Sequence, residues 1–497
     1  MSALPEIETP VAHAGQADIA ERLRARLRAS AVLVSREELK PYECDGLSAY
    51  RATPLVAAIP ADEDEVAAVL AVARETGTPV VARGSGTGLS GGALPLADGV
   101  LLSMARFNRI VAVDPLARRA RVQPGVTNLR ISQHVAPYGL YYAPDPSSQI
   151  ACSIGGNVAE NSGGVHCLKY GLTVHNIAKV HAITIEGDIV DFGSDALDAP
   201  GYDLLAAITG SEGLLAVTLE VTVKLLPKPD LAQVVMASFP NVESAGEAVA
   251  NVIGAGIVPA GLEMMDKLAT RAVEDFVHAG YDLDAEAILL AESDGTREEV
   301  AEEIAKISDV MRASGATDIR VSTSEAERLR FWSGRKAAFP AVGRISPDYY
   351  CIDGSIPRGA LALVLKRTEE LSASYGLRCA NVFHAGDGNL HPLILYDANN
   401  PGELEATERF AADILELCIE VGGTITGEHG VGIEKINQMC VQFTPAEIAQ
   451  FHALKAAFDS RGLLNPGKAI PELRRCAEYG AMRVKGGALP HPELPRF

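Results

Sequence analysis

The chain has 497 residues, a hydrophobic content of 47% and a formal net charge of −20. A chain of this length exceeds the size at which a single core usually stops growing, so two or more domains are expected. The acidic excess argues against nucleic acid and against an anionic membrane surface as direct partners, and no apolar run is long enough to span a bilayer.

The N-terminal sequence MSALPEIETP is acidic and lacks the basic and apolar regions of a secretory signal. Eight cysteines are scattered along the chain without a C-x-x-C pair, which is typical of reduced thiols and not of a disulfide scaffold or an iron–sulfur cluster. We therefore expect a cytoplasmic protein, in which an anionic substrate would need a local basic group.

Four regions follow one another along the sequence. Residues 1–50 predict a helical lead-in, and residues 51–228 predict a first domain of short apolar strands broken by glycine. Pro227, Lys228 and Pro229 mark the expected boundary. Residues 229–464 predict an α+β domain, with strand–helix–strand units at 234–264 and 287–322, an antiparallel sheet and helices on one face. Residues 465–497 are interpreted as a tail that returns to the first domain.

Residues 83–92 read RGSGTGLSGG and contain the pattern G-x-G-x-x-G. The continuation ALPLADGVLLS predicts a turn and a strand, whereas a Rossmann nicotinamide site needs a helix there, so such a site is not expected. Glycines also permit rows of inward-pointing N–H groups that bind phosphate without a helix. A flexible surface loop is the alternative. A second glycine-rich stretch at 154–164, preceded by PDPSSQ at 144–149, favours a large phosphate-bearing cofactor.

Residues 381–391 read NVFHAGDGNLH, and Asp387-Gly388 is typical of a two-residue hairpin turn. In that register His384 faces His391, with Cβ atoms about 4.5–5.5 Å apart. Glu428 and His429 lie among glycines further on. Two histidines and one carboxylate leave a divalent metal with open positions. Two unrelated strand histidines are the alternative, and from these residues alone a zinc-dependent hydrolase or a non-heme iron oxygenase would suit equally.

The glycine stretches, YDLLAAITGSEG at 202–213 and NPGK at 465–468 together resemble FAD-binding flavoproteins of the vanillyl-alcohol oxidase type. HAGDGNLH and GEHGVG are similar to motifs of FAD-linked 2-hydroxy-acid dehydrogenases, and residues 334–358 resemble the D subunits of glycolate oxidases. The resemblance implies an α+β fold, with a two-part FAD-binding domain and a cap domain that carries an antiparallel sheet.

The resemblance also implies how FAD is held. Some relatives bind flavin covalently through a histidine near the glycine loop, and Thr87 stands at that place here, so non-covalent FAD is expected. The implied cofactor-binding residues are Arg83, Gly84, Ser85, Gly86, Thr87, Gly88, Ser90, Gly91, Pro144, Asp145, Gly155, Asn157, Asn161, Gly163, Gly164, Gly213 and Asn465.

A mechanism follows from these assignments. A divalent metal, zinc or manganese, on His384, His391 and Glu428 would stabilise the alkoxide of the substrate, and His429 would act as general base. The hydride would go to flavin N5. By resemblance, Arg335 holds the substrate carboxylate. Relatives that act on D-2-hydroxyglutarate carry a lysine near Tyr350, and its absence favours a small monocarboxylate such as glycolate or D-lactate.

Reduced flavin must pass its electrons on, and the sequence predicts neither a cluster nor a nicotinamide site. The resemblance implies a second flavoprotein-like subunit and an iron–sulfur subunit of a glycolate oxidase complex, which would place the chain peripherally at the inner membrane through its partners. A stand-alone D-lactate or D-2-hydroxyglutarate dehydrogenase is the alternative. A transferase of the ether-lipid synthase type shares the fold and would need a lipid tunnel.

Overall fold

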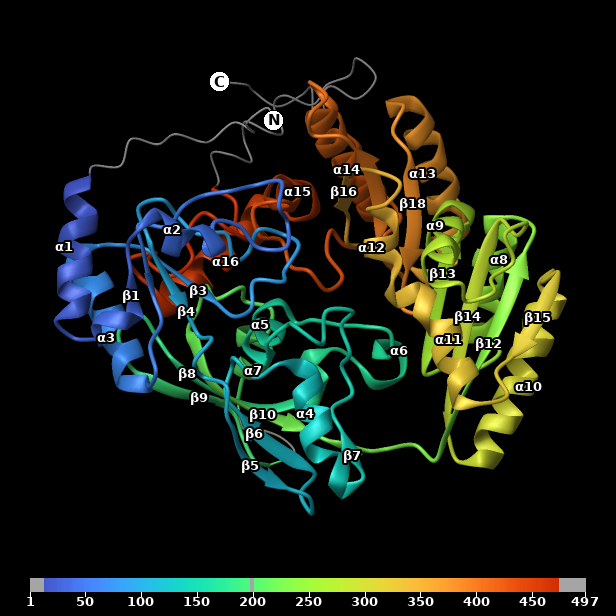
Figure 1. The fold of residues 1–497 in the computed structure, drawn as a ribbon, viewed down its shortest axis with the longest axis horizontal. Coiled ribbons are helices and arrows are strands. Elements are labelled where there is room, and N and C mark those ends of the chain that lie inside the picture. The colour runs from blue at the N-terminus through green and yellow to red at the C-terminus, as the bar shows by residue number, and fades with distance from the viewer. Residues whose placement is uncertain (1–12, 197–200, 473–497) are drawn as a thin grey trace.

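In the computed structural model, which describes residues 13–196 and 201–472, the first half of the chain forms two main sheets (Figure 1). The four-stranded sheet has the order β1-β2-β4-β3, and β4 is parallel to both β2 and β3. The five-stranded sheet is antiparallel, with the order β5-β6-β10-β8-β9. The strands are β1 (Val32–Leu33), β2 (Val56–Ala58), β3 (Val80–Arg83), β4 (Val100–Ser103), β5 (Ile110–Asp114), β6 (Arg119–Val122), β8 (Ile177–Ile183), β9 (Ile189–Gly193) and β10 (Val217–Lys224), while β7 (Leu140–Tyr141) pairs with β11 (Leu226–Pro227).

Helices of the first half begin and end at residues that suit these positions. In α3 the Asp62 side chain accepts a hydrogen bond from the Glu65 N–H, and the helix ends at Gly77 in the left-handed conformation. The predicted helical lead-in also contributes β1, which pairs with β2, so it is part of the first sheet. The helices are α1 (His13–Arg24), α2 (Arg36–Leu39), α3 (Glu63–Thr76), α4 (Asn128–Val135), α5 (Ile154–Glu160), α6 (Cys167–Tyr170) and α7 (Leu204–Ile208).

The second half is built on a seven-stranded sheet of order β15-β12-β14-β13-β18-β20-β16, in which every neighbouring pair is antiparallel. The antiparallel sheet of the predicted cap domain is therefore confirmed. Its strands are β12 (Leu231–Phe239), β13 (Gly261–Asp266), β14 (Ala287–Gly295), β15 (Asp318–Val321), β16 (Asp348–Cys351), β18 (Cys379–Phe383) and β20 (Pro392–Tyr396), and β17 (Gly354–Ser355) pairs separately with β19 (Asn389–Leu390).

Helices cover both faces of this sheet, so the prediction of helices on one face was wrong. Val235 and Phe239 of β12 pack in one core with α8 (Val242–Gly254), α10 (Arg297–Ala313), α13 (Leu361–Tyr375) and α14 (Glu403–Glu420). Val234 and Met236 point the other way, into a core with α9 (Lys267–Val277), α11 (Glu325–Lys336) and α12 (Ala338–Val342). Because successive residues of a strand face opposite sides, a strand with apolar side chains on both faces needs helices packed on both faces of the sheet.

The chain returns to the first half before residue 465, which is earlier than predicted. Helices α15 (Ile436–Gln442) and α16 (Pro445–Phe458) lie beside the N-terminal elements (Figure 1). The Lys455 ammonium donates to the Leu214 carbonyl, and Leu464 pairs with Val80 at the edge of β3. Residues 473–497 of the predicted tail lie outside the described residues.

Within the described residues, no helix is both long and apolar enough to cross a bilayer. The cysteines at 44, 152, 167, 351, 379 and 418 carry free thiols.

Candidate functional site

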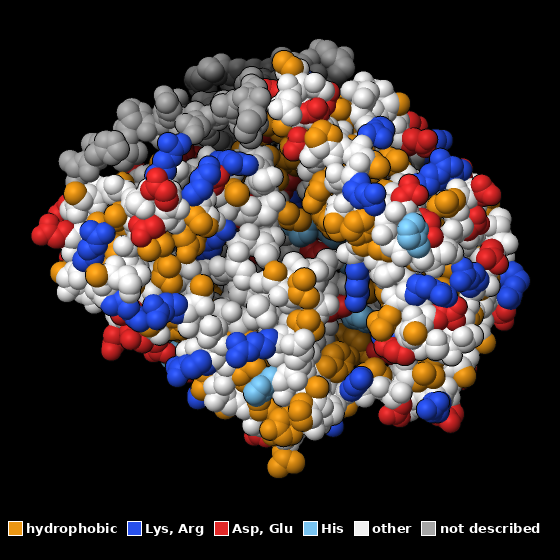
Figure 2. Space-filling model, viewed as in Figure 1, with side chains coloured by type: hydrophobic (Ala, Val, Ile, Leu, Met, Phe, Trp, Pro, Cys, Tyr) orange, Lys and Arg blue, Asp and Glu red, His pale blue; other side chains and the backbone are white. Residues whose placement is uncertain are grey.

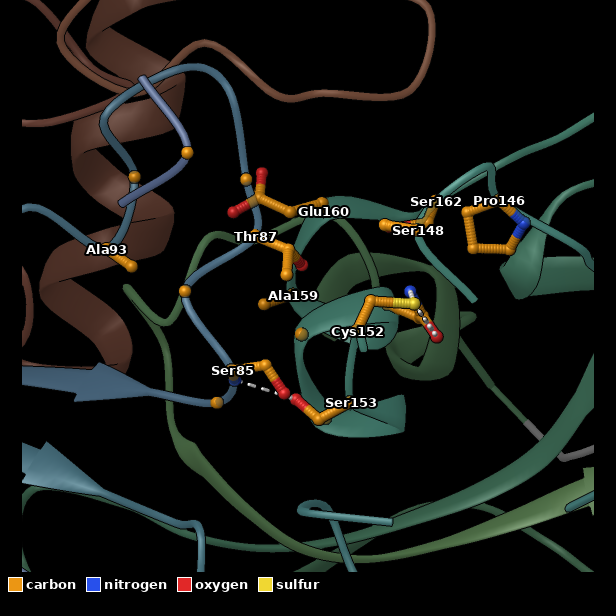
Figure 3. Close-up of a pocket in the computed structure, with 18 of the residues that line it drawn as sticks. Ser85, Thr87, Ala93, Pro146, Ser148, Cys152, Ser153, Ala159, Glu160 and Ser162 are labelled. Carbon is orange, nitrogen blue, oxygen red and sulfur yellow. Dashed lines mark hydrogen bonds between the residues drawn. The ribbon is translucent and has the colours of Figure 1, made fainter. Parts of the chain in front are cut away.

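A cavity of about 580 Å³ lies between the two halves of the molecule, and Figure 2 shows the surface hollowed there, with histidine atoms at the bottom. The glycine loop at 83–92 and helix α5 form one side (Figure 3). The second half contributes Lys336, Phe339 and Tyr349, and one end is lined by His391, Glu428 and His429. A volume of this size is within the range of cofactor and substrate pockets.

About half of the predicted cofactor residues line this cavity, namely Arg83, Gly84, Ser85, Gly86, Thr87, Gly88, Gly155, Asn157 and Gly213. The glycine loop continues without a helix, as predicted, and packs against the start of α5. A Cβ on Gly84 would lie 2.1 Å from Ser153 Oγ, and this oxygen accepts a hydrogen bond from Ser85 N at 3.2 Å (Figure 3). At Gly88, by contrast, an added Cβ would meet no atom within 4 Å, so this part of the loop leaves its backbone open to a large cofactor that approaches closely. Helix α5 was not predicted, because its sequence IGGNVAE starts with two helix-disfavouring glycines.

The other predicted cofactor residues do not line the cavity but organise its surroundings. The Ser90 hydroxyl donates to the His429 carbonyl, and Gly163 N donates to Glu428 Oε2. Asn465 donates to the carbonyls of Gly92 and Glu212. The remaining residues are Gly91, Pro144, Asp145, Asn161 and Gly164, of which Pro144, Asp145 and Asn161 accept hydrogen bonds from Asn128, His166 and Val174.

The histidine hairpin has a different register from the one predicted. His384 pairs with Asn389, and Asn381 pairs with Pro392, so His391 is a diagonal neighbour of His384. Only Gly388 of the expected turn pair has a positive φ, and the loop spans four residues. A shift of two positions keeps both histidines on one face, because side chains alternate with a period of two. Their ring centroids are 5.1 Å apart.

Three side chains meet at Glu428 Oε1. His384 Nε2 lies 3.2 Å from this oxygen and His391 Nε2 lies 3.4 Å from it. His391 Nε2 is buried between this oxygen and Asp353 Oδ1, which is 3.5 Å away, and makes a hydrogen bond of normal geometry to neither. One ligand atom from each of His384, His391 and Glu428 lies within 4.8 Å of the others, as a metal site requires. A buried imidazole nitrogen without a hydrogen bond of normal geometry, facing a carboxylate and a second imidazole, fits a divalent cation.

Charges in this cluster agree with such a site. Burial raises the pKa of Glu428, but its hydrogen bond with His384 and the charge of His384 outweigh this and lower it to about 2. Burial lowers the pKa of His384, but Glu263 and Glu428 outweigh this and raise it well above its ordinary value. The anionic character of Glu428 and Glu263 would attract a cation in place of the proton.

Glu263 and Arg335 stand behind His384. Glu263 Oε1 lies 2.6 Å from His384 Nδ1, and Oε2 accepts a hydrogen bond from Arg335 Nε at 2.7 Å. This contact orients the imidazole so that Nε2 faces the ligand cluster. Arg335 itself is 1% exposed and does not line the cavity, although its Nη2 has no hydrogen-bond partner. The neighbouring Lys336 does line it.

His429 lies beside the cluster, with its ring stacked on His391 at a centroid distance of 4.9 Å. Burial lowers the pKa of His429 to about 4 despite the nearby Asp353 carboxylate, and its Nδ1 has no hydrogen-bond partner. An uncharged imidazole with a free nitrogen at the cavity wall can accept a proton.

Asp353 was not singled out from the sequence, yet it holds the loop that carries Glu428 and His429. Its carboxylate accepts N–H groups of Gly427, Glu428 and His429 and is paired with Lys435 Nζ at 3.0 Å. Asp353, His391 and His429 form a second group with metal-ligand spacing. Because Asp353 already accepts these hydrogen bonds, this group is less suited to binding a metal than the group of His384, His391 and Glu428.

Comparisons with known proteins identify the family of the chain. Residues 54–193 match the family model described as "FAD binding domain", and residues 228–469 match "FAD linked oxidases, C-terminal domain". The chain is 62% identical to the glycolate oxidase subunit GlcD of Escherichia coli strain K12, covering 100% of this chain and 98% of that protein. It is 33% identical to a D-lactate dehydrogenase of Archaeoglobus fulgidus, covering 83% of this chain and 91% of that one.

Among solved structures, a p-cresol methylhydroxylase with substrate bound aligns with a TM-score of 0.79 over 94% of this chain and 98% of that chain, at 17% identity. A similarity at this level of identity shows the fold alone. It confirms the vanillyl-alcohol oxidase-type architecture expected from the motifs.

Proposed function

The chain belongs to the family of FAD-linked oxidases that includes the glycolate oxidase subunit GlcD, and we propose that it oxidises glycolate to the 2-oxo acid as a subunit of a glycolate oxidase complex. As a member it is an FAD-linked hydroxy-acid dehydrogenase, and its cofactor is FAD. The proposal concerns the substrate, the metal, the roles of individual residues and the partners.

One observation carries the chemical part of the proposal. His384, His391 and Glu428 converge at the end of a cavity that the glycine loop also lines, and His391 Nε2 is buried without a hydrogen bond of normal geometry. A small hydroxy acid can lie between a metal and a flavin only if the metal ligands are next to the cofactor cavity. A zinc-dependent hydrolase would leave the glycine-lined cavity unexplained.

Oxidation removes a proton from the substrate hydroxyl and a hydride, with two electrons, from the same carbon. His384, His391 and Glu428 would hold a divalent metal, zinc or manganese, which would supply a Lewis acid for the hydroxyl oxygen, and the glycine loop and the start of α5 would hold FAD, which would supply the hydride acceptor. His429 takes the hydroxyl proton at its free Nδ1, and stacking on His391 keeps its ring next to the metal ligands.

The family resemblance is the ground for assigning the substrate carboxylate to Arg335, because the side chain itself is buried and does not line the cavity. Its Nε is held by Glu263, which leaves the buried Nη2 as an unused donor of a planar guanidinium. Glu263 also contacts His384, so a single side chain supports both Arg335, which is proposed to hold the substrate carboxylate, and His384, which is proposed to bind the metal.

Turnover of the FAD-loaded chain with glycolate, D-lactate and D-2-hydroxyglutarate, using an artificial electron acceptor, tests the substrate. We expect the highest kcat/KM with glycolate and a lower value with D-lactate. The similarity to a D-lactate dehydrogenase favours D-lactate as the second candidate. A preference for D-2-hydroxyglutarate would contradict the assignment.

The partners are proposed to be a second flavoprotein-like subunit and an iron–sulfur subunit, through which the chain would lie peripherally at the inner membrane. The support is the similarity to a protein named as a subunit, together with the absence of a C-x-x-C pair from the sequence. An affinity-tagged chain purified from its native cells should bring both partners along. Quinone reduction by the isolated chain at the rate of the crude extract would make the complex unnecessary.

A further inference from the structure

Residues 427–432, which we call the catalytic loop, run between the two halves of the molecule. They carry Glu428 and His429, to which a metal-ligand role and a base role were assigned above. From the side of the second half, Asp353 accepts the N–H groups of Gly427 and His429 at 3.0 and 2.9 Å. This contact fixes the beginning of the loop only.

Lys435, paired with Asp353, donates to the Gly430 carbonyl at 2.9 Å, and the cofactor domain holds the end of the loop. Glu212 Oε1 accepts the N–H of Val431 at 2.6 Å, and Oε2 accepts the N–H of Gly432 at 2.8 Å. The Ser90 hydroxyl donates to the His429 carbonyl at 2.9 Å. The catalytic loop is therefore attached to the wall of the cofactor cavity by a carboxylate with two bonds and a hydroxyl with one.

Glu212 is itself part of that wall. It follows α7 and lines the cavity together with its neighbour Gly213. Its φ is +51°, a left-handed conformation that is uncommon for a non-glycine residue, and its N–H donates to the Ala159 carbonyl of α5. Strained backbone persists where its surroundings hold it, and it is concentrated at functional sites.

A second buried carboxylate lies beside it. Glu160, at the end of α5, lines the same cavity (Figure 3), and its Oε2 has no hydrogen-bond partner. Burial and the neighbouring Glu212 raise the pKa of Glu160 well above its ordinary value. Burial also raises the pKa of Glu212, but the N–H groups of Val431 and Gly432 oppose this, so of the two carboxylates Glu212 is the better suited to carry a negative charge.

We propose that Glu212 is a positioning residue, which fixes the catalytic loop to the cofactor domain and so sets where His429 stands relative to the flavin. The proposal rests on the proposed function, because it takes its importance from the role of His429. Two charge-assisted hydrogen bonds to successive N–H groups define both the position and the direction of the loop. A glutamine would keep one acceptor and turn an amide N–H₂ toward the other N–H.

The test compares FAD-loaded wild type, Glu212→Gln and the control Glu220→Gln. Glu220 belongs to β10 of the same domain and is paired with Arg121, away from the loop. In Glu212→Gln we expect kcat to fall about tenfold or more while KM for glycolate changes little, because a displaced base affects the transition state more than substrate binding. Amide hydrogen exchange of residues 427–432 should become faster, and bound FAD per chain should stay unchanged.

A wild-type kcat together with unchanged exchange in Glu212→Gln would overturn the proposal, and so would an equal change in Glu220→Gln. If Glu212→Gln does not fold, Ser90→Ala removes the hydroxyl bond to the His429 carbonyl and should give a smaller change of the same kind. Hydrogen exchange does not require turnover. If wild type fails to oxidise glycolate while Glu212→Gln still releases the loop, the proposed function fails and the positioning role stands.

Discussion

The side chain of Glu263 joins two groups that sequence patterns treated separately. One carboxylate oxygen faces the metal-ligand candidate His384, and the other accepts a hydrogen bond from the carboxylate-binding candidate Arg335. Such a partner holds the imidazole in the orientation in which its second nitrogen can bind a metal. A change at Glu263 should therefore act on metal binding without any contact with the metal.

Glu263→Gln should weaken metal binding by about 10- to 100-fold, as is typical for the partners of metal-binding histidines. The amide keeps the shape of the side chain but presents an N–H₂ group to one of two donors. Metal titration of the purified protein measures the effect, with Glu286→Gln as the control, because Glu286 is paired with Lys267 at the surface. Equal metal affinity in wild type and Glu263→Gln would show that Glu263 does not support the site.

His384→Ala should lose both metal and turnover and keep FAD, because the glycine loop belongs to the other half of the chain. His429→Ala should keep the metal and lose most of kcat. Metal analysis and the flavin absorbance of each purified variant give both answers, and the exposed His134 on α4 provides a control substitution. Equal metal occupancy in wild type and His384→Ala would refute the ligand assignment.

Residues close together in the sequence could be found as candidates, and those joined only by tertiary contacts could not. The hairpin residues lie within a dozen positions of one another, and Glu428 and His429 are adjacent. Turn chemistry and glycine spacing could therefore indicate both groups as candidates. Glu212 lies 219 positions from Val431, and Asp353 lies 76 positions from His429. Nothing local distinguishes these acids from surface carboxylates, since only the folded chain brings them to the loop.

The short helix α6 and the strand β14 form a second attachment between the halves. The half-buried His166, next to α6, lies between Asp145 of the first half and Glu292 of β14, at 2.8 and 3.2 Å. Burial lowers the pKa of His166, but these two carboxylates raise it well above its ordinary 6.5. Burial raises the pKa of Glu292, but His166 and Arg328 help to lower it from 4.5 to about 2.

This attachment gives folding stability a defined pH dependence. The raised pKa of His166 contributes stability that is fully present below 6.5 and is lost as the pH rises through the folded-state value. Thermal unfolding of wild type and His166→Gln from about pH 5.5 to about pH 9 should give the largest difference in Tm at the acidic end. A difference that is constant or that grows with pH would contradict the role of a charged His166.

Strand and helix patterns predicted most elements of the second half, including both strand–helix–strand units. They did not predict α9 or the helices on the second face of the sheet. Strand β14 is buried along almost its whole length. A continuous apolar run predicts that both faces of a strand are buried. It does not identify the segments, distant in sequence, that pack on the second face.

At the scale of the whole molecule, the cofactor cavity has its glycine loop on one half and its ligand cluster on the other, and Thr87 lines it where some relatives carry a flavin-linked histidine. Acid or heat denaturation should therefore release FAD into the supernatant, with about one flavin per chain, since no covalent bond is expected. The flavin absorbance of the supernatant and of the washed pellet shows whether FAD has been released. Flavin that stays with the polypeptide would contradict non-covalent binding.

The return of the chain to β3 has a consequence for how the protein loses its structure. Leu464 pairs with Val80, so the end of the described chain completes the edge of a sheet that begins near its start. The second half is in effect an insertion within the first, and one hydrophobic core draws residues from both halves. Severing the chain near Pro229 would remove this edge together with α16. The intact protein should accordingly melt in one cooperative transition.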